Sequence, residues 1–155
     1  MIKSIYADAD NTIYEKTGSL NAGIDSILEL TKVSSSAGIF TSRILMKFPL
    51  DDVSASIASG EIVRPRFLLN LYQTETVEIP LEYKLIAYPL SQSWTPGVGR
   101  AIEPTNENGY IKEGSSWKYR DKEVGTVEYV PARDTQWTSR SLAAGSQILY
   151  SNVTG

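Results

Sequence analysis

The sequence predicts an all-β fold with one short connecting helix, and two stretches carry this prediction. In residues 43–50 apolar side chains fall at every second position, with Arg43 and Lys47 between them. This is the period of a half-buried strand. In residues 66–72 the apolar positions alternate again around Asn70. Two such strands form the centre of a sheet whose apolar side needs a second layer, so a β-sandwich is expected.

The core of this sandwich is expected to contain Phe48, Leu69 and Leu71, which lie on the apolar faces of the two strands. A chain of 155 residues suits one domain and can bury roughly 70% of the surface that its unfolded form exposes. We therefore expect residues 1–155 to form a single β-sandwich domain.

Composition excludes several kinds of chemistry. The chain has no cysteine and no histidine. Disulfides, thiolate metal sites and hydrolysis with a histidine base are therefore excluded. The net charge of −3 arises from 15 basic and 18 acidic residues that are interspersed, which disfavours nucleic acid or an anionic membrane as a partner. The start of the sequence lacks the apolar stretch of a signal peptide.

The first third of the chain is expected to contain short strands and turns. Residues 2–7 predict a first strand, residues 8–12 a turn of short polar side chains, and residues 13–14 a second extended piece. The segment 24–33 is ambiguous, because a short helix capped by Asp25 and a strand fit its pattern equally well.

A flexible loop is expected at residues 34–38, before the first organising strand. After that strand, residues 51–59 predict a two-turn helix. Asp51 or Asp52 suits its N-cap, and Gly60 suits its C-terminal stop.

The second half predicts fewer regular elements. Strands are expected at residues 67–72, 83–88 and 146–150. Between the last two, residues 91–134 are rich in Gly, Pro, Asn and charge, which predicts a long loop-rich insertion. Asn108-Gly109 is the one good hairpin-turn signal within it.

Acidic residues offer weak candidate sites. Asp8, Asp10 and Asp25 carry the oxygen ligands that calcium prefers, but the same residues suit a plain turn at a strand end. No other metal or cofactor is expected. The pair Asp51-Asp52 could serve glycoside hydrolysis, yet favourable placement at the positive end of a helix dipole accounts for both carboxylates.

The aromatic residues of the second half are the candidates for an interface or a ligand site. Three interpretations stay open: a framework for the core, a protein interface, and a platform for sugar rings. Arginine is also prominent at interfaces. The candidates are Trp94, Tyr110, Trp117, Tyr119, Arg120 and Trp137.

Four stretches resemble one known family. Residues 7–14, 21–30, 42–50 and 65–72 are similar, in that order, to the strand motifs of the DNRLRE-type, carbohydrate-binding-module-like β-sandwich family. The three tryptophans are also spaced like those of the family. The resemblance implies a sandwich of jelly-roll type, and it favours a strand for residues 24–33.

The lengthened loop around residues 97–120 makes the chain similar to virion structural proteins of tailed bacteriophages. This resemblance implies a non-enzymatic component of the tail, baseplate, neck or capsid exterior, synthesised in the host cytoplasm without a signal peptide. It would act by protein–protein assembly as a homo-oligomer, with other virion proteins and copies of itself as partners and without nucleic acid or membrane. The alternative is a carbohydrate-binding module that attaches to host surface polysaccharide.

Nothing resembling the family's late pair of strands follows Tyr150. A shortened family fold and one part of a longer protein are both open interpretations. In either case a sheet that lacks these strands has an open edge, and an open edge can pair with a neighbouring subunit.

Overall fold

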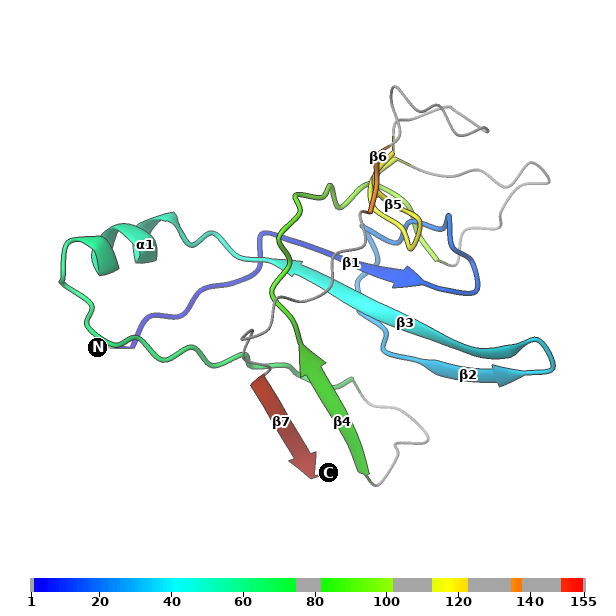
Figure 1. Cartoon of the computed structure of the whole chain (residues 1–155), viewed down its shortest axis with the longest axis horizontal. Helices are drawn as coiled ribbons and strands as arrows, with labels where there is room; N and C mark the ends of the chain where they lie inside the picture. The colour runs from blue at the N-terminus through cyan, green and yellow to red at the C-terminus, as the bar shows by residue number, and fades with distance from the viewer. Residues whose placement is uncertain (1, 75–81, 102–112, 123–134, 138–148, 155) are drawn as a thin grey trace. The chain divides into compact units, whose positions relative to one another are not determined.

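The computed structural model is mostly strand in its regular parts, with a single short helix in the portion it describes. The strands form three small antiparallel sheets (Figure 1), which confirms a β-rich chain. The described residues are 2–74, 82–101, 113–122, 135–137 and 149–154. Nothing among them is a helix of the length and apolarity that crossing a bilayer requires.

The chain divides into two compact units, which are described separately. Unit 1 comprises Met1–Leu50 and Gln92–Ser139, and unit 2 comprises Asp51–Ser91 and Arg140–Gly155. The expectation of one sandwich domain stays a prediction.

Unit 1 is organised by a three-stranded sheet in the order β1-β3-β2. β1 spans Ala9–Tyr14, β2 spans Lys32–Ser35 and β3 spans Gly38–Lys47. The long β3 pairs with β2 over its first part and with β1 over its second (Figure 1). The strand predicted over residues 43–50 is therefore confirmed up to Lys47, and it begins five residues earlier than expected.

The first strand begins later than the sequence predicts. Residues 2–7 lie outside any strand, whereas β1 includes Asp10, Asn11 and Thr12, which we expected to form a turn. Tertiary contacts override the turn preference here. Asn11 and Thr12 are almost completely buried, and both side chains form hydrogen bonds to distant segments of unit 1.

The strand expected over residues 24–33 is wrong for residues 24–31, since β2 begins only at Lys32. In this earlier part the backbone amides of Glu29 and Thr31 donate to side chains of β1 and β3, and one backbone bond, from Ser42 N to Thr31 O, joins the segment to β3. The loop expected at residues 34–38 is shorter than predicted, since Ser34 and Ser35 belong to β2 and Gly38 to β3, and a tight turn at residues 36–37 joins the two strands. Gly38 opens β3 with a φ of 129°, a backbone conformation that glycine adopts without steric cost.

A second, two-stranded sheet in unit 1 joins β5, Tyr119–Asp121, to β6, Thr135–Gln136. Both strands lie within or next to the predicted long insertion. The hairpin signal at Asn108-Gly109 lies outside the described residues.

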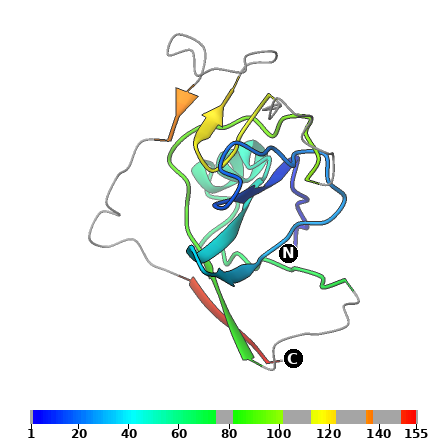
Figure 2. The same ribbon diagram turned by 90° about the vertical axis from the view of Figure 1, so that its right-hand side faces the viewer.

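Unit 2 contains helix α1, Asp51–Ala58, and an antiparallel pair of β4, Glu82–Ala87, with β7, Leu149–Thr154. Figure 2 shows β4 and β7 side by side. The predicted helix and the strand over residues 83–88 are confirmed. The strand expected over residues 146–150 begins at Leu149 in the described part, and residues 146–148 lie outside it.

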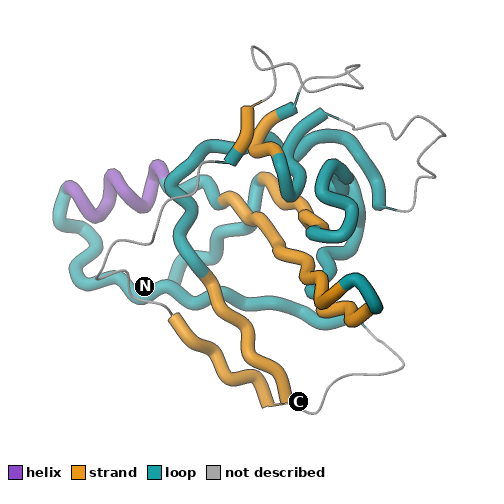
Figure 3. The backbone as a smooth tube through the Cα atoms, turned by 45° about the vertical axis from the view of Figure 1, so that its right-hand side comes forward, coloured by secondary structure: helices purple, strands orange, loops and turns teal. Residues whose placement is uncertain are grey.

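The strand predicted over residues 67–72 is wrong, because this stretch lies outside every helix and strand (Figure 3). Leu69 and Leu71 are each 48% exposed, so they do not form a core. Phe48 is only half-buried, beyond the end of β3. Among the residues for which the structure describes side-chain burial, which leaves out 82–84, 135 and 149–154, the buried apolar ones are Ile13, Ala22, Val53 and Tyr119.

Candidate functional site

Both faces of the β1–β3 pair are covered by polar contacts. Residues directly opposite each other in an antiparallel pair share a face. Asn11 is opposite Leu45, and Thr12 is opposite Ile44, so Asn11 and Thr12 point to different sides. Both are buried. Arg43 and Lys47 of β3 are exposed, as the alternation predicts, but at Asn11 and Thr12 both faces of the pair are covered.

The first face is covered by an asparagine centre, which we define as Asn11, Asn21 and Ser115. Asn11 Nδ2 donates to the backbone oxygen and to Oγ of Ser115, both at 2.8 Å. Its Oδ1 accepts a hydrogen bond from Ala22 N at 3.1 Å. The three residues of the centre are 0 to 1% exposed. A buried amide is stable when its donors and acceptors are satisfied, as they are here.

Asn21 connects more segments than any other side chain of this centre. Its Nδ2 donates to Pro96 O at 2.6 Å and to Ser115 O at 2.7 Å. Its Oδ1 accepts from Gly99 N at 2.7 Å and from Gly23 N at 3.2 Å. One side chain thus holds the loop after β1, the stretch before residue 100 and the segment around Ser115.

Two glycines allow the backbone to approach this centre closely. Gly97 has a φ of 83° and Gly114 a φ of 99°, in the region where residues with a side chain are strained. A Cβ on Gly97 would overlap Glu113 O and the Asn21 side chain, and one on Gly114 would overlap the Gly97 backbone. The asparagine centre is therefore filled, and a ligand has no room there.

The second face is covered by the segment that precedes β2. Thr12 Oγ1 accepts a hydrogen bond from Glu29 N at 3.0 Å. Ser42 Oγ accepts one from Thr31 N and donates to Glu29 O, both at 2.7 Å. These bonds explain why residues 29–31 do not form a regular strand, since side chains take the Glu29 amide and carbonyl and the Thr31 amide.

Tyr14, at the end of β1, faces a carboxylate. Its hydroxyl donates to Glu29 Oε2 at 2.9 Å. Burial raises the pKa of Tyr14 well above its ordinary value, and the hydrogen bond and charge of Glu29 and the charge of Asp25 raise it further. A phenol that is kept protonated is a hydrogen-bond donor and does not act as a base near neutral pH.

The structure places most of the aromatic candidates within unit 1 as packing residues. The Arg43 guanidinium lies 4.6 Å from the centroid of the Trp117 ring. Trp137 Nε1 donates to Ser116 O at 2.8 Å, and Tyr119 is 7% exposed. Trp94 is half-buried. Tyr110 lies outside the described residues.

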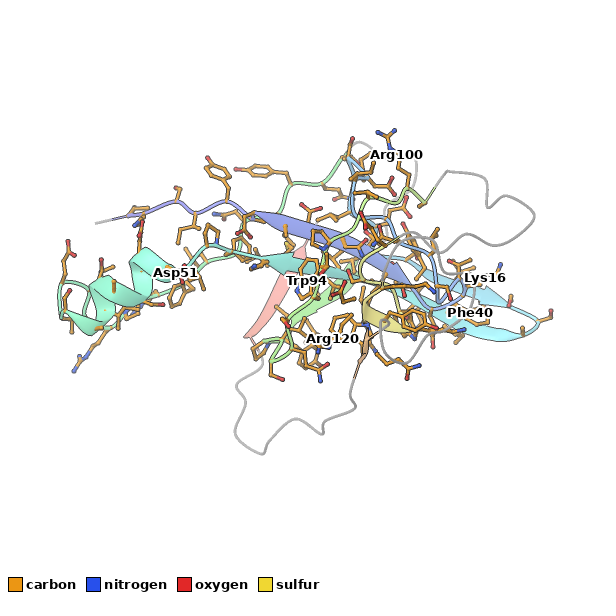
Figure 4. All side chains as sticks on the ribbon, turned by 90° about the horizontal axis from the view of Figure 1, so that it is seen from above. Lys16, Phe40, Asp51, Trp94, Arg100 and Arg120 are labelled. Carbon is orange, nitrogen blue, oxygen red and sulfur yellow. The ribbon has the colours of Figure 1, made fainter. Side chains whose placement is uncertain are left out.

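Arg120 also forms contacts within the unit. Its Nη1 donates to the backbone oxygen and to Oγ of Ser93, both at 2.9 Å. Figure 4 labels Arg120 together with Trp94, the neighbour of Ser93. Within the predicted loop-rich insertion, Ser115, Ser116 and Tyr119 are all buried, so residues 113–122 pack within their own unit.

The weak calcium candidates are not gathered into a site. Asp8 is exposed, and Asp25 Oδ2 accepts a hydrogen bond from Ala101 N at 3.0 Å. Across the described ranges, no three acidic side chains lie close enough together to hold a metal ion. Asp51 and Asp52 lie in the first turn of α1, where the helix dipole favours them.

The most unusual surface lies in unit 2, at residues 66–72, which we call the apolar strip. Five of its seven side chains are large, apolar and exposed: Phe67 59%, Leu68 87%, Leu69 48%, Leu71 48% and Tyr72 95%. No hydrogen bond joins the strip to the rest of the described chain. Its strand-like pattern was visible in the sequence, but we assigned it to the core, so the strip was missed as a candidate surface.

Comparison with known proteins adds no relative, since no family model, curated protein or solved structure matches this chain.

Proposed function

We propose that this chain is a non-enzymatic structural component of a bacteriophage virion, built as a β-sandwich of jelly-roll type, that acts by protein–protein assembly. The resemblance of its sequence to virion proteins of tailed phages supports this proposal. The apolar strip is the structural observation that carries it.

The strip supports assembly on energetic grounds. Large contiguous apolar patches are uncommon on soluble monomers and are typical of interaction sites. Fully burying one Leu or Phe side chain contributes about 1.5–3 kcal/mol. A partner that covers several of the five exposed side chains therefore gains enough to offset the cost of immobilising the stretch.

The thin packing of unit 2 supports the same proposal. Among residues 51–74 and 85–91, the part of unit 2 for which the structure describes side-chain burial, Val53 is the buried apolar residue, while Ile57 on the same helix is 40% exposed. Its sheet has two strands, and an isolated pair of strands is marginally stable in water. Contact with a neighbouring subunit supplies the missing apolar cover.

The filled asparagine centre supports a role without catalysis. A catalytic group needs a free donor, acceptor or nucleophile that faces a cleft. The side-chain amide of Asn21 instead forms its hydrogen bonds with backbone groups of its own unit. The absence of histidine and cysteine from the sequence agrees with this proposal.

The contacts of the tryptophans favour assembly over sugar binding. A sugar platform needs an exposed ring face. The guanidinium of Arg43 occupies one face of Trp117, and Trp137 is tied to Ser116 through its indole nitrogen. These rings support the local fold of unit 1.

The test is incorporation of the chain into particles. Phage particles purified from a host strain that encodes this chain are expected to contain it in several copies, as measured by mass spectrometry. Leu68→Asp should remove the chain from particles while leaving its circular dichroism unchanged. The control is Val63→Asp, because Val63 is 74% exposed and lies outside the strip.

Absence of the wild-type chain from particles would overturn the proposal. Retention of the isolated chain on host polysaccharide, lost in Trp94→Ala without loss of fold, would favour the carbohydrate-binding alternative.

A further inference from the structure

We propose that the apolar strip pairs with the strip of a second copy of this chain, as an antiparallel pair of strands centred on Leu69. The inference rests on the proposed function, because it names the partner at the surface through which the chain is proposed to assemble.

The backbone of the strip is available for pairing. It belongs to no helix or strand, and none of its amide or carbonyl groups is bonded within the described part of the chain. The strip contains no proline, although Pro65 precedes it and fixes where a ladder can begin. A row of unpaired backbone groups beside apolar side chains is the surface to which another strand adds.

The position of the single charge, Arg66, favours antiparallel over parallel pairing of the two strips. In that direction Arg66 of one strip lies opposite Tyr72 of the other, so a cation faces an aromatic ring. In the parallel direction Arg66 would lie opposite Arg66, and like charges directly opposite each other are destabilising. The strip contains no other charge, so this one residue decides the direction.

The apolar pattern selects the register. Phe67, Leu69 and Leu71 share one face of an extended strip, and they are arranged symmetrically about Leu69. With Leu69 opposite Leu69, each Phe67 meets a Leu71 and all positions of the strip are paired. A shift by one residue would place apolar side chains opposite the wrong face. A shift by two residues keeps the face but shortens the overlap.

This register makes the strip self-complementary. Six apolar side chains, three from each copy, come together on one face in a closed two-fold arrangement. Such an isologous contact uses the same patch on both partners, so pairing through this face stops at the dimer. Leu68 meets Asn70 on the other face, which stays open to further partners.

Single-cysteine variants of the full chain test both direction and register, because the natural sequence has no cysteine. Leu69→Cys, Arg66→Cys and Tyr72→Cys would each be treated with copper–phenanthroline and run without reductant. Val63→Cys serves as an exposed control outside the strip.

We expect Leu69→Cys to form a covalent dimer in at least tenfold higher yield than the other three variants. The mixture of Arg66→Cys with Tyr72→Cys should cross-link, although neither does so alone. Strong cross-linking of Arg66→Cys to itself would overturn the antiparallel direction. Similar weak yields at all positions would overturn the pairing itself.

The mass of the unmodified chain in solution gives a second readout that is independent of the variants. Sedimentation equilibrium should give twice the 17.1 kDa of one chain, and Leu69→Asp should reduce it to one. A monomer at all concentrations up to about 100 μM would overturn the inference. If particles still contained such a monomer and lost Leu68→Asp, only the identity of the partner would be wrong, and the proposed function would stand.

Discussion

Buried amides hold unit 1 together where the sequence led us to expect apolar side chains. Asn11 and Asn21 are fully buried, and their amides bond to backbone groups far away in the sequence. Such contacts are costly to break, because a buried group that loses its partner retains the cost of its desolvation.

Asn21→Ala is expected to lower the free energy of unfolding by about 3 kcal/mol, since it leaves Pro96 O, Ser115 O and Gly99 N without this partner. Chemical denaturation at a concentration where the chain is monomeric measures the change. The control Asn70→Ala, on an exposed residue, should change stability by less than about 0.5 kcal/mol. Equal effects of the two substitutions would contradict the role of Asn21.

Tyr14 predicts a loss of stability at alkaline pH. Its pKa is raised in the folded state by burial and by Glu29, so above about pH 10, the ordinary tyrosine value, the unfolded chain releases a proton that the folded chain keeps. Stability from this group is therefore complete below about pH 10 and falls as the pH rises further. Denaturation midpoints of wild type and Tyr14→Phe should show a shallower alkaline decline in the variant. Parallel curves would contradict this assignment.

Among the elements, the β5–β6 pair is supported by a hydrogen bond from the Trp137 indole, after β6, to Ser116, before β5. Trp137 follows β6, and its indole nitrogen donates to the oxygen of Ser116, which is itself buried. The half-buried Trp94 forms no hydrogen bond through its indole in the described residues. The two tryptophans therefore make a matched pair.

Trp137→Phe should lower the free energy of unfolding by about 1–2 kcal/mol more than Trp94→Phe, because only the first leaves a buried carbonyl without its donor. Both substitutions keep an aromatic ring, so the loss of volume is similar. Thermal unfolding of the two variants measures the difference. A larger effect at Trp94 would show that packing, and not this hydrogen bond, supports the pair.

The elements that sequence predicts well are those decided by local chemistry. Helix α1 has acidic residues in its first turn, and Gly60 beyond its end has a φ of 79°, as capping rules require. Residues 24–31 could not be predicted, because their backbone bonds to Thr12 and Ser42 side chains that are distant in sequence. The asparagine centre was missed for the same reason, since Asn11 and Asn21 look like turn residues when taken alone.

The apolar strip shows a different limit of prediction from sequence. Its period was recognised, but periodicity indicates only that a face can be buried and not what buries it. We expected a second layer of the same chain to cover this face, whereas Phe67, Leu69 and Leu71 stay about half exposed. A partner outside the chain satisfies the same pattern.

For the whole molecule, the packed residues 113–122 and the exposed apolar strip are expected to differ in hydrogen exchange. Amides that are bonded within unit 1, such as those of Ser115, Ser116 and Gly114, should exchange slowly in the free chain as well as in the assembled one. Mass spectrometry of deuterated peptides covering residues 113–122 checks this, and rapid exchange there in the free chain would contradict the packing described above.

The most direct test of the proposed assembly is the exchange of residues 66–72 in the dilute monomer and in the assembled protein. The unpaired backbone of the strip predicts exchange close to that of an unstructured peptide in the monomer, and at least tenfold slower exchange on assembly, because a ladder of hydrogen bonds then forms. Residues 113–122, measured in the same samples, serve as the internal reference. Equally fast exchange of the strip in both states, or strong protection already in the monomer, would contradict the claim that this surface joins the chain to its partners.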